Sequence, residues 1–304
     1  MVGPIVSKLA IVILNYNTKD LVKGCLDSLL PLINETVDLI VVDNASTDDS
    51  LEYLRTVERI ELLTSKENLG FTGGNNLGLR RALEKKADYI MLLNSDTLAK
   101  NAFWQPMIEF LKNNPKVGVV GPKIYFAPGY EFYKDKYKKE DLGKVIWSVG
   151  GSIDWNNVYG ENQGVDQVDE GQFDQPAEAD FISGCCLLAS REVWQKIGLL
   201  NEKYFLYYED TEFSLRVKKT GRQVWCFPGS VIWHLNAGSS QCGGDLQDYF
   251  ITRNRLLFGL SWAPIRTKLA LIRESFRLLA SGRSWQKKGV RDFYLRKFNR
   301  GSWQ

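Results

Sequence analysis

The first 120 residues alternate short apolar runs with helical patterns, and this alternation restricts the fold more than any other feature of the chain. Residues 8–14 (KLAIVIL) and 38–42 (DLIVV) are nearly continuous and β-branched, which is typical of strands buried on both faces. The same criteria predict strands at 60–63, 89–93 and 117–120, and helices at 21–30, up to 56, 71–86 and 102–112. This order predicts a doubly wound, mostly parallel sheet with helices on both faces.

The regular alternation stops after Pro122. Residues 130–141 are charged, tyrosine-rich and without period, which predicts a mobile surface loop. We expect turns and edge strands over 150–175, strands at 179–182, 223–226 and 231–233, and helices at 191–197 and 209–219. From residue 245 the pattern is helical with a break at Pro264, so we predict a C-terminal helical extension over 245–304.

Composition indicates a soluble globular chain, with 304 residues of which 44% are hydrophobic. The five cysteines form no C-x-x-C pair, and an odd number in apolar surroundings predicts buried, reduced thiols. Neither a signal-peptide pattern nor an apolar run of about 18 residues is present, so we expect a cytoplasmic protein.

The C-terminal segment is strongly basic, although the whole chain carries only +3. Residues 253–300 contain thirteen Lys/Arg and two acidic residues, interleaved with aromatic side chains. Two interpretations stay open: a helical appendage packed on the domain, or a segment that makes peripheral contact with anionic lipid on the inner face of the cell membrane. Nothing else in the sequence suggests nucleic acid, which we do not expect as a partner.

Polar side chains follow three of the predicted strands. They are Asp43, Asn44 and Ser46 after the second strand, Asn68 and Gly70 after the third, and Asn94 and Asp96 after the fourth. Because carboxyl ends of parallel strands meet at one edge of a sheet, these residues predict a single site. Taken separately, each cluster could equally form a turn or cap the following helix.

Each cluster suits a different part of a nucleotide ligand. An acidic residue such as Asp43 often contacts the base or ribose in doubly wound folds. Glycines at the helix start near residues 70–74 allow backbone amides to approach phosphate, although the segment is neither a G-x-G-x-x-G fingerprint nor a Walker loop. Asp96 could share a hard cation with that phosphate, and His234, the only histidine, could complete the coordination shell or be structural.

Two adjacent carboxylates, Glu209 and Asp210, open the helix predicted at 209–219 behind an aromatic run. Acidic residues also suit the positive end of a helix dipole, so this placement alone does not imply catalysis. Together with the clusters at the sheet edge, the pair becomes a candidate for proton transfer.

The ordered motifs resemble the family 2 glycosyltransferases, inverting enzymes of the GT-A fold, and particularly their bacterial rhamnosyltransferase-like branch. The matching segments are residues 13–17 (ILNYN), 42–48 (VDNASTD), 68–71 (NLGF), 76–78 (NLG), 93–96 (LNSD), Gly184, 207–210 (YYED), Pro228, 233–234 (WH) and 249–257 (YFITRNRLL). The resemblance implies a GT-A domain over residues 1–244, with a nucleotide-binding half (1–98) and an acceptor half (99–244).

The resemblance also implies roles for individual residues. Asp210 matches the general base, with Glu209 supporting it or touching the acceptor. Asp96 matches the last residue of the D-x-D element, and with His234 it would bind Mg²⁺ or Mn²⁺ at the diphosphate. The implied nucleotide-sugar contacts are Asn15, Asn17, Asp43, Asn44, Ser46, Asn68, Gly70, Gly74, Asn75, Asn94 and Asp96.

The implied donor is a dTDP- or UDP-sugar, and the implied acceptor is a glycan or a lipid-linked molecule. Two positions depart from the family pattern: Asn94 replaces the first D-x-D carboxylate, and Glu212 stands where the E-D-x-D motif ends. A sugar-nucleotide pyrophosphorylase is the enzymatic alternative, but the basic, glycine-rich loop typical of that class is absent at residues 15–18. An inactive nucleotide-sugar-binding module is the other alternative.

Overall fold

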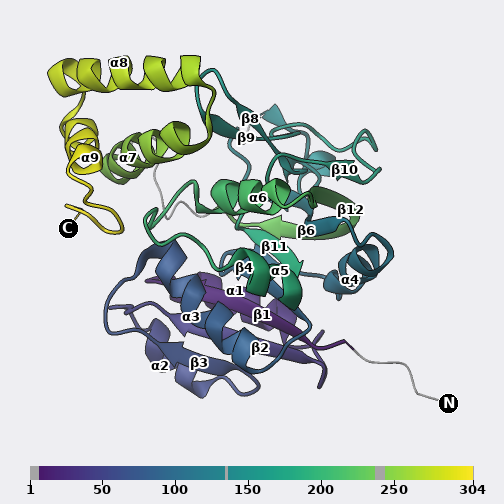
Figure 1. Ribbon diagram of the computed structural model, residues 1–304. Helices are drawn as coiled ribbons and strands as arrows, with labels where there is room; N and C mark the ends of the chain where they lie inside the picture. Colours follow the sequence, from purple (N-terminus) through teal and green to yellow (C-terminus); the bar gives the residue numbers. More distant parts are fainter. Residues whose placement is uncertain (1–6, 134–135, 237–243, 304) are drawn as a thin grey trace.

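The computed structural model describes residues 7–133, 136–236 and 244–303 (Figure 1). Within them, the main sheet has ten strands, eight of them in the order β10-β12-β6-β11-β4-β1-β2-β3. The N-terminal elements are β1 (Leu9–Asn15), α1 (Lys19–Leu29), β2 (Val37–Asp43), α2 (Ser50–Thr56), β3 (Glu61–Thr64), α3 (Gly70–Glu84) and β4 (Tyr89–Asn94). The four strands pair in parallel, as the alternation of strands and helices predicted.

Helices cover both faces of this sheet, and alternate side chains of β1 explain why. Ile11 and Ile13 enter one core with residues of α1 and of α4 (Trp104–Asn113). Val12 enters the opposite core, to which α3, α5 (Arg191–Ile197) and α6 (Glu209–Lys219) contribute. The β-branched run is therefore buried on both sides, and the prediction of two helical layers is confirmed.

The sheet continues past Pro122, contrary to the predicted end of the fifth strand. Strand β6 runs over Val117–Phe126 and pairs in parallel with β12 (Gln223–His234), which is one strand and not the two that were predicted. The register of β12 shifts between Phe227 and Val231, beside Pro122. Since proline has no N–H for the ladder, a bulge in the neighbouring strand accommodates it.

The prediction of a strand at residues 179–182 is also wrong. Only Ala177–Glu178 (β10) forms a short strand there, and Phe181 makes a single bridge to Gly151. Of the strands that sequence reasoning missed, the longest is β11 (Cys186–Ser190), which lies antiparallel between β4 and β6. A short apolar run carries no period that distinguishes it from its neighbours, so its place depended on long-range pairing.

The predicted loop over 130–141 is anchored, although residues 134–135 lie outside the described residues. Glu131 is buried and accepts the amides of Gly129 and Gly143, and the loop ends in a short 3₁₀ turn. The remaining short strands are β5 (Thr97–Leu98), β7 (Ile146–Ser148), β8 (Gly151–Asp154) and β9 (Tyr159–Asn162). Strands β8 and β9 lie in the region where turns and edge strands were predicted, but they pair with each other as a separate two-stranded antiparallel sheet.

Three helices form the C-terminal segment: α7 (Asp245–Trp262), α8 (Ile265–Ser281) and α9 (Ser284–Tyr294). The break after α7 falls at Pro264, as predicted. Across the described residues, no helix combines the length and apolar character needed to cross a bilayer. Four cysteines are free and buried, as predicted, and Cys242 lies outside the described residues.

Candidate active site

The carboxyl ends of β1 and β2 form a hydrogen-bonded network. The side-chain amide of Asn15 donates to the Asp43 carboxylate and to the Ser46 hydroxyl, both at 3.1 Å. The Ser46 amide donates to the second Asp43 oxygen (3.1 Å), and the backbone N–H of Asn17 donates to the Ser46 hydroxyl (3.0 Å). Asn15 and Asp43 are buried beneath this network, whereas Asn17 and the neighbouring Tyr16 are exposed at its rim.

A second network joins Asn44 to the start of α3. The side chain of Asn44 accepts the Leu69 amide (3.0 Å) and donates to Asn68, which in turn accepts the Gly70 amide (2.8 Å). Gly70 has φ +71°, and a Cβ there would lie 2.5 Å from the Phe205 carbonyl oxygen, so glycine is required.

This network changes one expectation about the glycine-rich helix start. The amides of Leu69, Gly70 and Thr72 are bonded to Asn44, Asn68 and the Phe205 carbonyl respectively, so these three are not free for phosphate. Gly74 lies against Leu14, and the Asn75 amide donates to the carbonyl of Phe71 in its own helix. Gly74 and Asn75 thus contribute to the packing of α3, and their contacts with a donor stay predictions.

Strand β5 brings Asp96 to His234. Thr97 pairs with His234, and the Leu235 amide donates to the Asp96 carbonyl (2.8 Å). The His234 Nε2 then lies 3.1 Å from Asp96 Oδ1, and the ring packs on Trp147 with centroids 4.6 Å apart.

The electrostatics of this pair favour a charged imidazole in the protein alone. Burial lowers the pKa of His234, but Cys185 and Asp96 beside the ring outweigh that effect and raise it overall. Burial raises the pKa of the Cys185 thiol, while the neighbouring His234 lowers it. The Asp96 side chain, 3.1 Å from Nε2, is one of the two neighbours that raise the pKa of His234.

The pair has the donor chemistry of a partial metal site. Neither nitrogen of the buried His234 ring makes a well-directed hydrogen bond to a described residue. No cluster of three His, Cys, Asp or Glu suited to a metal occurs in the described part of the chain, so two protein ligands are available here. A cation with one carboxylate and one imidazole would take its remaining ligands from phosphate oxygens and water.

Asp210 lies at the first turn of α6 and is partly exposed. One carboxylate oxygen accepts the Gly184 amide at 2.8 Å, and the other accepts the Thr211 amide (2.6 Å) and hydroxyl (3.1 Å). Burial raises the pKa of Asp210 against these bonds, which lower it. A partly buried carboxylate that is held from two sides is oriented for proton transfer.

Residues 184 and 185 connect this carboxylate to the Asp96–His234 pair. Gly184 donates to Asp210, while Cys185 accepts the Asn94 backbone amide through its carbonyl (2.9 Å) and has its thiol beside His234. A Cβ at Gly184 would lie 2.9 Å from the Phe71 ring of α3. The turn before β11 therefore brings the base candidate, the carboxylate–histidine pair and α3 together.

The sequence profile described as "Glycosyl transferase family 2" matches residues 10–198. The chain belongs to this glycosyltransferase family. It is 24% identical to the low-salt glycan biosynthesis hexosyltransferase Agl10 of Haloferax volcanii over 82% of this chain and 74% of the relative. It is 25% identical to the dTDP-rhamnosyl transferase RfbF of Shigella flexneri, over 83% of this chain and 79% of the relative.

A third relative is N-acetylglucosaminyl-diphospho-decaprenol L-rhamnosyltransferase of Mycobacterium tuberculosis, at 22% identity over 76% of this chain and 77% of the relative. Among solved structures, GalNAc-T7 with UDP, GalNAc and Mn²⁺ superposes with a TM-score of 0.60 at 13% identity; 96% of this chain matches 57% of that one. The mannosyltransferase PcManGT of Pyrobaculum calidifontis, with GDP-Man and Mn²⁺, superposes with a TM-score of 0.54 at 16% identity. The match covers 95% of this chain and 74% of that one. These structures confirm the GT-A fold.

Glu209 of this glycosyltransferase is buried beside Asp210, and its Oε2 has no hydrogen-bond partner among the described residues. Burial, and then the charge of Asp210, raise the pKa of Glu209 well above its ordinary value. Burial and the neighbouring carboxylate both favour the neutral form of Glu209, which reduces repulsion between the two carboxyl groups.

The loop before α6 is strained and depends on α7. Phe205, Tyr207 and Tyr208 have φ of 65°, 70° and 72°, in the left-handed region that bulky residues rarely adopt. The side-chain amide of Asn254 donates to the carbonyls of residues 204, 206 and 207 at 2.7–3.0 Å. Arg253, fully buried, donates to the carbonyls of residues 203 and 204.

Arg253 and Asn254 are the site-supporting residues that our residue-level predictions missed. The sequence signals for them were their place in the family-matching segment 249–257 and the run of four polar residues at 252–255. Their partners are backbone carbonyls nearly 50 positions upstream, a relation that no local pattern encodes.

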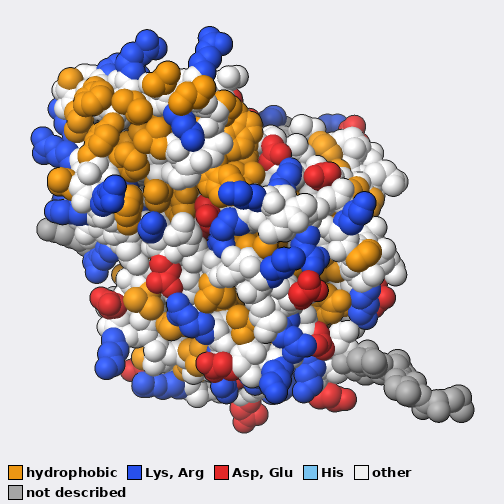
Figure 2. All heavy atoms as spheres, viewed as in Figure 1, with side chains coloured by type: hydrophobic (Ala, Val, Ile, Leu, Met, Phe, Trp, Pro, Cys, Tyr) orange, Lys and Arg blue, Asp and Glu red, His pale blue; other side chains and the backbone are white. Residues whose placement is uncertain are grey.

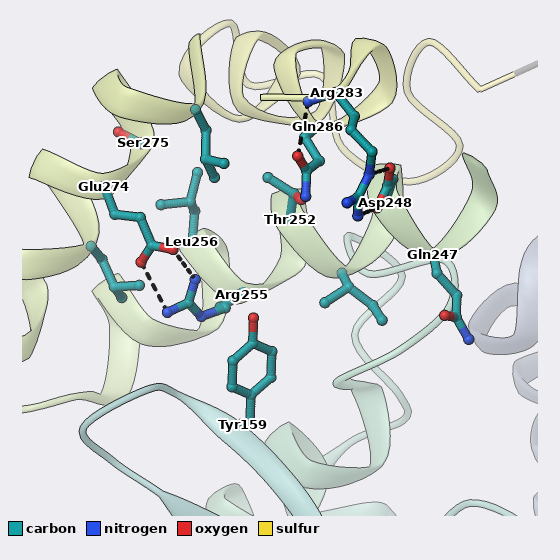
Figure 3. Close-up of a pocket in the computed structure, with 13 residues that line it drawn as sticks. Tyr159, Gln247, Asp248, Thr252, Arg255, Leu256, Glu274, Ser275, Arg283 and Gln286 are labelled. Atoms are coloured by element: carbon teal, nitrogen blue, oxygen red, sulfur yellow. Dashed lines mark hydrogen bonds and ion pairs between the residues drawn. The ribbon is translucent and has the colours of Figure 1, made fainter. Parts of the chain in front are cut away.

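A cavity of about 270 Å³ lies between α7, α8, α9 and β9, away from these groups. In Figure 3, Arg255 faces Glu274 at 3.0–3.1 Å, and Arg283 is paired with Asp248. None of the predicted site residues lines this cavity. Its ion pairs tie the three C-terminal helices to one another, which is a structural role.

Proposed function

We propose that this chain is a metal-dependent, inverting glycosyltransferase that moves a sugar, with rhamnose as the first candidate, from a nucleoside diphosphate to an acceptor hydroxyl. The observation that carries the proposal is the turn at residues 184–185. It hydrogen-bonds to Asp210 on one side and, on the other, to Asn94 at the strand end before Asp96, with the Cys185 side chain beside His234. Base and leaving group must flank one sugar ring in such a reaction, and this arrangement supports that geometry.

The donor would bind at the ends of β1 and β2. Asp43 and Asn15, fixed by Ser46, present polar groups for the base and ribose, and Asn17 lies at the exposed rim. We favour dTDP over UDP as the nucleotide because RfbF is named a dTDP-rhamnosyl transferase.

Asp96 and His234 would hold Mg²⁺ or Mn²⁺, with His234 giving up its proton to ligate the ion. Bound there, the metal supplies positive charge that offsets the charge developing on the departing diphosphate. Asn94 lies at the end of β4, two residues before Asp96, and its backbone N–H donates a hydrogen bond to the Cys185 carbonyl.

Asp210 would accept the proton of the acceptor hydroxyl as that oxygen attacks the anomeric carbon. The new glycosidic bond forms opposite the breaking bond to the diphosphate, so the configuration inverts through an oxocarbenium-like transition state. A free aspartate has a pKa of roughly 3.9, and the raised pKa of Asp210 makes it a stronger base.

We further propose a glycan or lipid-linked acceptor, met at the inner face of the cell membrane through the basic C-terminal segment. The mycobacterial relative supports a lipid-linked acceptor, because its name specifies a diphospho-decaprenol substrate. In this assignment, residues 1–98 bind the donor and 99–244 the acceptor.

The test is a panel of dTDP- and UDP-sugars, assayed by thermal shift with and without Mn²⁺ and then by donor hydrolysis. We expect one donor to stabilise the protein in a metal-dependent manner and to be turned over, and its product to be inverted when analysed by NMR. Synthesis of a nucleotide-sugar from a sugar phosphate and a nucleoside triphosphate would instead identify a pyrophosphorylase. Binding without any turnover would identify an inactive module.

A further inference from the structure

Helix α8 exposes a continuous apolar stripe. Its inner face is buried through Thr267, Leu271 and Ser275. The outer side chains, with exposed fractions of 72%, 62%, 36% and 60%, are Ile265, Leu269, Ile272 and Phe276. Their spacing of four, three and four residues places them on one side of the helix, so the stripe is a surface and not a set of scattered side chains.

A row of arginines runs beside this stripe. Arg266, Arg273 and Arg277 are exposed, and none forms an ion pair with any residue in the described ranges. The only carboxylate of α8 is Glu274, which is paired with Arg255 of α7. The outer side of α8 therefore combines apolar area with positive charge that has no local counter-charge.

The stripe extends onto the end of α9. The Phe276 ring stacks on Tyr294 with centroids 6.0 Å apart, and Leu295 is 65% exposed. Figure 2 shows hydrophobic side chains gathered over the α8–α9 end of the molecule, with Lys and Arg at the margins of that area. In Figure 1, α8 forms the outer edge of the molecule, at the end opposite β2 and β3.

We propose that the stripe of α8, continued by Tyr294 and Leu295, docks on the surface of an anionic lipid bilayer. This deepens the proposed membrane contact, because it names the face and rests on the proposed use of a membrane-proximal acceptor. A helix of this kind lies in the interface, with apolar side chains among the acyl chains and cations at the headgroups.

Charge favours a bilayer over a second copy of this chain. A two-fold interface brings the same patch of both subunits together. Stripe-to-stripe contact would therefore gather two sets of Arg266, Arg273 and Arg277 around an interface whose only α8 carboxylates are already paired. Anionic headgroups supply the missing counter-charge.

Docking through α8 would also fix the position of the catalytic groups relative to the bilayer. Helix α7 precedes α8 directly and holds the loop before Asp210 through Arg253 and Asn254. A bilayer bound at α8 would thus lie against the same helical unit that supports the base, where a lipid-linked acceptor would arrive.

The experiment is flotation of the full chain with vesicles of phosphatidylcholine, alone or mixed with phosphatidylglycerol. We expect binding to the anionic vesicles that weakens with added salt. Leu269→Gln with Phe276→Gln should lower the partition coefficient by about tenfold or more. Arg273→Gln with Arg277→Gln should lower it by roughly 30-fold, at about fivefold per cation.

Matched controls come from exposed residues elsewhere in the fold. Lys66→Gln with Lys116→Gln removes two exposed cations, and Val165→Gln replaces an apolar side chain that is 39% exposed. Both should leave partitioning unchanged, and all variants should keep the wild-type Tm. Equal partitioning of the α8 variants and wild type, or a dimer that dissociates in the Leu269/Phe276 variant without vesicle binding, would overturn the lipid assignment.

Donor hydrolysis without vesicles separates this inference from the proposed function. Hydrolysis by a chain that does not float would overturn the docking surface alone. Flotation that depends on α8 in a chain with no turnover of any donor would overturn the transferase proposal and leave the surface standing.

Discussion

The two sides of the candidate active site are held in different ways. On the donor side, Asn15, Asp43 and Ser46 lie at the ends of adjacent strands and bond to one another. On the base side, Asp210 follows a strained loop whose carbonyls are held by Arg253 and Asn254 of α7. The donor side is therefore completed by neighbouring elements, whereas the position of the base depends on a helix beyond the matched family region of residues 10–198.

Asp210→Asn gives the largest expected effect. The substitution preserves shape but removes the proton acceptor, so kcat should fall by about 10²–10⁴-fold. Donor affinity, measured by thermal shift, should stay within a factor of two or so of wild type, since the donor side is self-contained. Weak donor binding with a near-normal rate would contradict the assigned role.

Asp96→Ala should rank next. Loss of the carboxylate leaves His234 as the only protein ligand of the pair, so kcat should fall by about 10²–10³-fold. Titration with Mn²⁺ should give a weaker apparent metal affinity for this variant. A chelator that leaves the wild-type rate unchanged would remove the metal from the proposal.

Asn254→Asp tests the difference between the two sides most directly. It keeps the side-chain shape but replaces the donor of the bonds to residues 204, 206 and 207 with an acceptor. We expect kcat to fall by on the order of tenfold or more, because small misplacement of a catalytic group is costly.

For this variant, donor Kd should not change, and Ser261→Ala near the exposed end of α7 is the matched control. A parallel rise in donor Kd would mean that the two sides are not independent. Arg253→Lys should lose less than Arg253→Ala, since lysine keeps a cationic donor but not the planar fork.

Glu209→Gln should change stability more than rate. The pKa of Glu209 is higher in the folded chain than in the unfolded chain, where it is roughly 4.3. Between these two values the unfolded chain is ionised and the folded chain is not, so the folded state loses stability as pH rises through this range. Glutamine removes this penalty, so we expect a Tm a few degrees higher than wild type at pH 8, with the gain shrinking toward pH 4. A gain that is the same at both pH values would contradict a buried, titrating Glu209.

The pH–rate profile tests the base in the same framework. The raised pKa of Asp210 means that kcat should fall as pH drops through a midpoint above that of a free aspartate, roughly 3.9. An assay saturated with metal and with excess donor isolates this acidic side of the pH–rate profile. A midpoint at or below the free value would argue against the desolvated base.

Asn17→Ala gives the smallest effect. Asn17 is exposed at the donor rim and accepts the Thr47 amide at 2.7 Å, so its loss loosens one loop of a network that Asn15 and Asp43 still hold. We expect a severalfold rise in donor KM at unchanged kcat, which is the cost of about one hydrogen bond.

Local sequence pattern was enough to predict the secondary structure of the donor half. The strands β1 to β4 and the helices between them appear within a few residues of their predicted bounds, because buried β-branched runs and helical spacing are properties of the segment itself. Pattern failed where pairing partners decide: β11 was missed, residues 179–182 were assigned a strand, and the strand that became β6 was ended at Val120. A bulge in a strand more than 100 residues away explains the last error.

By itself the sequence determined the parallel half of the sheet, through its alternation of strands and helices, and the family and the residue types of the candidate site, through the order of its motifs. Only the tertiary structure decided that Gly184 and Cys185 join Asp210 to His234, that Asn254 supports the loop before the base, and that α8 leaves an apolar stripe exposed. The physical reason is range: backbone propensity and side-chain period act within a segment. Hydrogen bonds to distant carbonyls and the choice of which helix face is covered depend on the packing of the whole chain.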